Sequence, residues 1–142
     1  MKVTGTKDMA GLRVAAIAET NAACGQVRAR YITIAPGQEL IYAEKEKEAL
    51  RYLAGWPDPA SPAPTLGDFP FIAAELGITA ADPWTLAMIW VEGAAQFRVI
   101  GAGIETYRLS TIAGIEAAAS PAALDALLAV LRADLAAYLA PS

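Results

Sequence analysis

The residue types that perform most enzyme chemistry are nearly absent from this sequence. It contains no His and a single Cys, Cys24. Cys24 follows Ala22-Ala23 in an alanine-rich segment, and no imidazole is present to activate it, so we interpret it as a small buried hydrophobe rather than a nucleophile. The same composition excludes imidazole general bases and Cys/His zinc sites within one chain.

The remaining candidate groups have the wrong spacing for catalysis. Glu92 and Glu105 lie on one predicted helix, roughly 20 Å apart at 1.5 Å per residue, which is too far for a glycosidase carboxylate pair. Gly101-Ala102-Gly103 lacks the Gly-Lys-Ser/Thr that completes a phosphate-binding loop. The sequence therefore predicts a protein that is not an enzyme, with no catalytic residues, no cofactor and no metal site.

Charge and hydropathy exclude two further classes of partner. The chain has 11 Lys and Arg against 15 Asp and Glu, for a net charge of −4, and its basic residues are scattered rather than clustered as phosphate binding requires. The most apolar stretch, Trp84 to Ile104, is interrupted by Glu92, Gln96 and Arg98. No secretory signal is recognised at the start of the sequence. We expect a soluble protein of a reducing compartment, with no nucleic-acid partner and no membrane insertion.

The longest predicted element is a helix over residues 83–119, capped by Thr79 or Asp82. Its apolar residues form two series with a spacing of seven, which together predict a heptad-like seam. One series is Trp90, Phe97, Ile104 and Thr111, and the other is Leu86, Gly93, Ile100, Tyr107 and Gly114. We expect this seam to be an interface, and glycines in a helix interior indicate close packing or a bend.

The charges beside this seam have two interpretations. Glu105 and Arg108 are three residues apart and are able to form a solvated pair on the helix surface. The alternative is that Arg98 or Arg108 lies inside a multi-chain seam and sets its register. The candidate interface residues are therefore Trp90, Phe97, Arg98, Ile104 and Arg108.

Four shorter helices complete an all-α fold of about five helices. They are predicted over residues 8–31, from Pro36 through Leu53, from a cap at Asp68 to a stop at Gly77, and from the cap Ser120-Pro121 to the residue before Pro141. A small β-hairpin at 30–43 is the alternative to the second helix, because Tyr31-Ile-Thr-Ile34 has β propensity.

The predicted domain organisation is simple. Residues 1–7 form a flexible N-terminal arm, and residues 8–142 form one helical domain with a proline-rich crossover at 55–67. Pro59 and Pro62 give a P-x-x-P motif without a flanking basic residue, so we favour a structural crossover over a ligand for SH3-type domains.

Several motifs in residues 12–118 resemble alanine-rich helical proteins and domains encoded among tail genes of tailed bacteriophages and prophages. The motifs are Arg30-Tyr-Ile-Thr, Pro36-Gly-Gln, Tyr42, Lys45, Glu48-Ala49, Tyr52-Leu53, Phe69-Pro70, Ala73-Ala74-Glu75, Gly77-Ile78-Thr79, Ile104-Glu105 and Arg108-Leu109. The proline-rich stretch at 57–64 is longer here than in that group.

The resemblance implies a virion structural protein of the tail fibre or tail tip, without enzymatic activity, made in the host cytoplasm and located in the tail. Its expected partners are itself and other phage tail proteins, and a trimer is the first expectation because fibres of that group are commonly trimeric. Two alternatives remain open. One is a tail-fibre assembly chaperone, and the other is a small-molecule-binding helical bundle whose pocket is lined by aromatic residues and Arg98 or Arg108.

Overall fold

The computed structural model describes residues 8–32 and 37–140, and it confirms the predicted all-α fold with five α-helices. These are α1 (Met9–Arg28), α2 (Gln38–Ala54), α3 (Pro70–Glu75), α4 (Pro83–Ala117) and α5 (Pro121–Leu139), with a 3₁₀ helix, η2 (Leu66–Asp68), before α3. Among the described residues, the β-structure is limited to an isolated bridge between Leu76 and Ala80. The alternative hairpin is not supported, because α2 begins at Gln38, although residues 33–36 lie outside the described range.

The N-terminal caps predicted for α4 and α5 are present. The Asp82 carboxylate accepts from the backbone N–H of Thr85 at 2.8 Å and from the hydroxyl of Thr85 at 2.8 Å, and these bonds hold the pKa of Asp82 below its ordinary value. Ser120 accepts from the N–H of Ala123 at 3.2 Å, with Pro121 in the first turn of α5. The caps explain where these helices begin, because each one satisfies an N–H that has no partner within the helix.

The predicted cap of α3 was wrong. Asp68 lies in η2, and the side chain that caps α3 is Glu48 from α2. Its buried carboxylate accepts from the backbone N–H groups of Phe71 at 3.1 Å and Ile72 at 2.8 Å. A carboxylate that reaches the helix from a distant segment satisfies the same orphan donors as a local cap, and local sequence cannot reveal it. The stop at Gly77 has a direct cause, because that residue has a φ of 86°.

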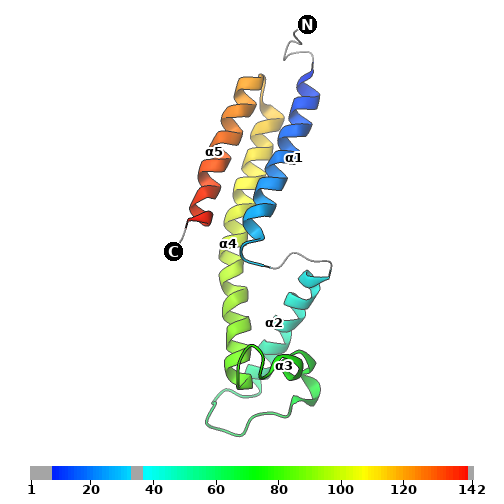
Figure 1. Cartoon of the computed structure of the whole chain (residues 1–142), viewed down its shortest axis with the longest axis vertical. Helices are drawn as coiled ribbons and strands as arrows, with labels where there is room; N and C mark the ends of the chain where they lie inside the picture. The colour runs from blue at the N-terminus through cyan, green and yellow to red at the C-terminus, as the bar shows by residue number, and fades with distance from the viewer. Residues whose placement is uncertain (1–7, 33–36, 141–142) are drawn as a thin grey trace. The chain divides into compact units, whose positions relative to one another are not determined.

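The chain divides into two compact units. The bundle unit comprises the described parts of residues 1–33 and 100–142, and the aromatic unit those of residues 34–99. In the bundle unit, α1 lies alongside α5 and the second part of α4 (Figure 1). Two buried clusters join these three helices, one of Ala16, Ile115, Ala118, Leu124 and Leu128, the other of Cys24, Val27, Ile104, Leu131 and Leu135. The start of α1 packs against the start of α5 and the end of α4, so α1 runs parallel to α5 and antiparallel to α4.

Side chains of α1, and of Arg30 and Tyr31 just after it, bind carbonyls at the C-terminal ends of α4 and α5. Arg13 Nη2 donates to the carbonyl of Ala118 at 2.7 Å, directly after the end of α4. Arg30 Nη1 donates to the backbone carbonyl of Leu139 at 3.1 Å, and the hydroxyl of Tyr31 donates to the backbone carbonyl of Tyr138 at 2.6 Å. Helix C-termini have unpaired carbonyls and a partial negative charge, so arginine is well suited to cap them.

Close packing explains two of the glycines in α4. A Cβ atom at Gly103 would lie 2.2 Å from the hydroxyl of Tyr138, and one at Gly114 would lie 2.8 Å from a methyl group of Leu127. Both glycines therefore admit side chains of α5. A Cβ atom at Gly93 would meet nothing within 4 Å, so packing does not require that glycine.

The aromatic unit contains α2, η2, α3 and the first part of α4. Its buried core consists of Ala49, Tyr52, Trp56, Ile72, Leu86 and Ala87. The ring of Tyr52 meets those of Phe69 and Trp56 edge to face, with centroids 4.9 and 5.7 Å away.

The proline-rich crossover packs on these rings. Trp56 Nε1 donates to the backbone carbonyl of Ser61 at 2.7 Å, and the hydroxyl of Tyr52 donates to the backbone carbonyl of Pro64 at 3.4 Å. Between Trp56 and Ser61, the backbone turns at Asp58, whose carbonyl accepts from the N–H of Ser61 at 3.0 Å. The crossover therefore connects α2 to η2 as a covering loop of this unit rather than as an extended spacer.

Candidate docking surface

The five predicted interface residues fall into two groups. Trp90, Phe97 and Arg98 belong to the aromatic unit, while Ile104 and Arg108 belong to the bundle unit. Trp90 packs against the aromatic core, and the ammonium of Lys45 lies 5.1 Å from its ring centroid.

Phe97 is half-buried. Arg98 is exposed and forms an ion pair with Glu46 of α2. The ammonium of Lys45 also binds Glu75, with its Nζ 2.6 Å from Oε2. Lys45 and Arg98 are thus engaged within the chain.

Ile104 lies in the core of the bundle unit, whereas Arg108 lies at its surface and is half-buried. Ile104 is fully buried with Cys24 and Leu131, so it has no surface to offer a partner. The guanidinium of Arg108 binds both carboxylate oxygens of Glu105 and donates to Asn21 Oδ1 at 3.1 Å. That interaction lowers the pKa of Glu105. The solvated-pair interpretation of Glu105 and Arg108 therefore matches the contacts that are present.

Cys24 lies in the core of the bundle unit with no exposed surface. Burial raises the pKa of its thiol, which disfavours the nucleophilic thiolate. Within residues 8–32 and 37–140, no group of three or more His, Cys, Asp or Glu side chains is arranged to hold a metal ion. No helix in the same ranges is both long and apolar enough to span a bilayer.

The outer face of α5 carries few charges for a helix face that is exposed to solvent. Solvent-facing positions of a helix are normally polar. The exposed positions of α5 include two charged residues, Asp125 and Arg132. The others are apolar, and those on the side away from the bundle core form what we call the α5 outer face: Ala122, Ala126, Ala129, Val130, Ala133, Ala136 and Ala137. Val130, the largest residue of this face, is 60% exposed.

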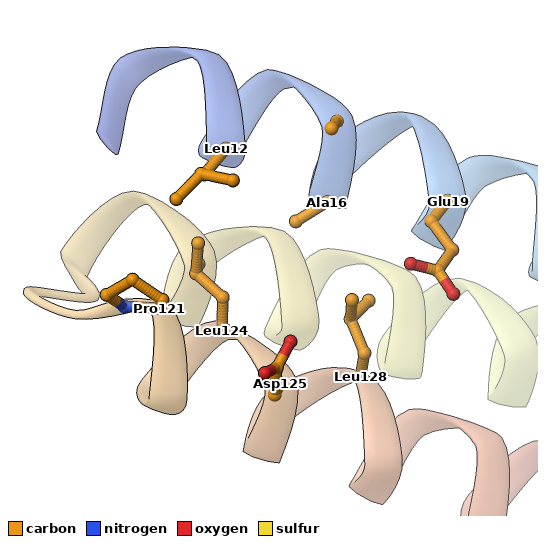
Figure 2. Close-up of a pocket in the computed structure, with 8 residues that line it drawn as sticks. Leu12, Ala16, Glu19, Pro121, Leu124, Asp125 and Leu128 are labelled. Carbon is orange, nitrogen blue, oxygen red and sulfur yellow. The ribbon is translucent and has the colours of Figure 1, made fainter. Parts of the chain in front are cut away.

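A shallow groove borders this face. It lies between α1 and α5, with a volume of about 180 Å³, and Figure 2 shows it with Leu12, Leu124 and Leu128 along an apolar floor. Glu19 and Asp125 stand at its sides. The groove thus combines apolar surface with acidic groups.

The two acidic groups of the groove differ in their contacts. Glu19 Oε1 accepts from Arg132 Nη2 at 2.6 Å. Asp125 makes no hydrogen bond or ion pair within the described part of the chain. A basic group on a partner therefore has one unpaired carboxylate to bind.

A second cavity, of about 410 Å³, opens on the aromatic unit beside Leu50, Arg51 and Phe71. Arg51 there lies over the ring of Phe69, 4.9 Å from its centroid, and donates to the carbonyl of Asp68 at 3.2 Å. Neither this cavity nor the α1–α5 groove is lined by Arg98 or Arg108, the residues expected at a small-molecule pocket.

The α5 outer face was missed by the sequence analysis. The prediction for this segment was a helix alone, and it assigned no interface to the alanines on the outer side. The available signal was the recurrence of alanine at every seventh residue, at positions 122, 129 and 136.

Comparison of the chain with protein-family models, with curated proteins and with solved structures finds no match.

Proposed function

We propose that this chain is a bacteriophage tail-associated structural protein, a tail-fibre or tail-tip component that works by protein–protein association. The observation that supports association best is the α5 outer face, an exposed helix face whose charges are confined to its margin. The tail assignment rests on the sequence motifs that resemble tail-gene products.

The physical basis of the proposal is the free energy of covering that face. Burying apolar surface contributes about 25 cal/mol per Å². Alanine adds little to this per residue, but it admits a partner helix at short distance and loses almost no side-chain entropy when covered. Val130 adds a larger side chain to the same surface, and Asp125 and Arg132 are placed to set register from the margin.

Mass spectrometry of purified particles tests the proposed location. Particles of the phage or prophage that encodes the chain are expected to contain it in stoichiometric amounts relative to other tail proteins. If the chain is absent from particles but bound to a fibre protein during assembly, it is a chaperone instead. If native mass spectrometry shows a monomer with a co-purified small molecule, the binding-bundle alternative is correct.

A matched pair of substitutions tests the proposed surface. Val130→Glu places a charge on the α5 outer face and is expected to reduce both self-association and recovery of tail proteins with the tagged chain. Leu50→Glu is the control, because Leu50 is 50% exposed on α2 in the aromatic unit. Equal effects of the two substitutions, at unchanged helix content, would refute the proposed surface.

A further inference from the structure

The α5 outer face has a charge pattern that complements itself. Asp125 and Arg132 lie on the same margin of the face, seven residues apart, so they differ by about 20° around the helix. The seam they border consists of alanines spaced alternately by three and four residues, at positions 122, 126, 129, 133 and 136. This is the spacing by which two helices pack along a coiled-coil seam.

Symmetry selects the orientation of a second copy. In an antiparallel pair of α5 helices, related by a two-fold axis near Ala129, each margin faces the same margin of the partner helix. Asp125 of each copy then lies opposite Arg132 of the other, which gives two identical ion pairs. In a parallel two-fold pair the charged margin of each copy faces the opposite, uncharged margin of the other, so no reciprocal ion pair forms and the antiparallel arrangement is favoured.

We propose that a second copy of this chain docks on the α5 outer face as an antiparallel two-fold dimer, with reciprocal Asp125–Arg132 ion pairs across an alanine seam. This inference rests on the proposed function and specifies its partner. Asp125 has no partner inside the chain, and Arg132 is held by the exposed Glu19, so both are accessible to a second copy. The groove between α1 and α5 extends the apolar surface beside Asp125.

The size of the interface sets the expected strength. α5 has 19 residues and is about 28 Å long at 1.5 Å per residue. A single helix pair of that length buries less than the roughly 1,200–2,000 Å² of stable complexes. We therefore expect a dimer that dissociates on dilution rather than a permanent one.

The test is a charge exchange on the full chain, read by sedimentation equilibrium over a range of concentrations. Asp125→Arg and Arg132→Asp each place like charges opposite each other twice per dimer, and each is expected to weaken dimerisation at least about tenfold. The double variant Asp125→Arg/Arg132→Asp restores both pairs and is expected to dimerise like the original chain. An equimolar mixture of the two single variants is expected to form a heterodimer.

Glu19→Gln is the matched control, because it removes the contact of Arg132 within the chain and leaves the seam unchanged. Circular dichroism establishes that every variant keeps its helix content. A trimer, or a dimer that tolerates both single reversals, would overturn this inference and leave the proposed association intact. A monomer at every concentration would overturn self-association as well, and with it this part of the proposed function.

Discussion

The bundle unit and the aromatic unit are both built from helices, yet they differ in what they show to solvent. The exposed positions of α2 in the aromatic unit include four charged residues, Glu39, Glu44, Lys47 and Arg51, beside the apolar Leu40 and Leu50. α5 of the bundle unit exposes mainly alanine and Val130. The two helices thus differ in the number of charges on their outer faces, and this difference is the reason that we propose α5, and not α2, as the docking surface.

Their interiors differ as well. The bundle unit is packed with aliphatic side chains and admits α5 through glycines, whereas the aromatic unit depends on edge-to-face rings and one buried carboxylate. All three tryptophans, at positions 56, 84 and 90, lie in the aromatic unit. Tryptophan fluorescence therefore follows that unit alone, while circular dichroism follows the helices of both, so the two units can be compared within one sample.

The largest effect is expected for Tyr52→Ala. Tyr52 has no exposed surface and contacts Phe69 and Trp56, so the substitution leaves a cavity and is expected to cost about 3–5 kcal/mol. Chemical denaturation is expected to show a large shift of the tryptophan transition and a smaller shift of the dichroism transition. Tyr52→Phe is the control and is expected to cost under about 1 kcal/mol, because only a long hydrogen bond is lost. Coincident transitions in both proteins would show that the units unfold together.

A smaller effect is expected for Glu48→Ala. The substitution leaves the N–H groups of Phe71 and Ile72 without an acceptor at the buried start of α3, at a cost of about 2 kcal/mol. The tryptophan transition should again shift more than the dichroism transition. Glu44→Ala on the exposed side of the same helix is the control, with an expected change within about 0.5 kcal/mol. Similar losses for both variants would refute the capping role of Glu48.

Two alanine substitutions in α4 are expected to have opposite signs. Gly93→Ala has open space around it and should stabilise the protein by about 1 kcal/mol through helix propensity. Gly103→Ala gains the same propensity but displaces the ring of Tyr138, and overpacking of about 1–3 kcal/mol should leave a net loss. Thermal unfolding followed by dichroism measures both. Stabilisation by Gly103→Ala would show that Tyr138 moves aside without loss of packing.

These glycines also show where sequence analysis succeeded. The long helix, its cap at Asp82 and the Ser120-Pro121 start of α5 follow from local rules, since a cap and its helix are neighbours in sequence. The glycines of α4 predicted close packing or a bend, and close packing is present at 103 and 114 but not at 93. Nothing in the sequence distinguishes the three, because the atoms that fill the space beside Gly103 and Gly114 belong to α5.

The candidate site was harder to predict for a related reason. A heptad of large side chains predicts that a helix face is buried, but not whether the chain itself or a second chain buries it. Ile104 illustrates this, because its own chain covers it completely. The cap of α3 by Glu48 is similar, because the N–H groups that it binds belong to Phe71 and Ile72, which follow it by 23 and 24 residues. Contacts between distant segments decide both cases, and periodicity within one segment contains no information about them.

The smallest effect we predict is a difference in acid sensitivity between the units. Burial tends to raise the pKa of Glu75, but its bonds to Lys45 and Thr79 prevail and hold it below the ordinary value of 4.5. Because the folded pKa is depressed, the stabilisation is complete above that value and is lost as pH falls through the lower folded pKa. Glu75→Gln should therefore flatten the decline of stability below pH 4.5 when tryptophan fluorescence is followed.

Glu105 provides the matched substitution in the bundle unit, because its bond to Arg108 also lowers its pKa. Glu105→Gln should alter the acid dependence of the dichroism transition while leaving that of the fluorescence transition unchanged. Asp82 retains a lowered pKa in the aromatic unit, so the fluorescence slope of Glu75→Gln should be reduced rather than abolished. If either substitution changes both transitions equally, the two units share one cooperative transition, and α4, the helix common to both, is the element that couples them.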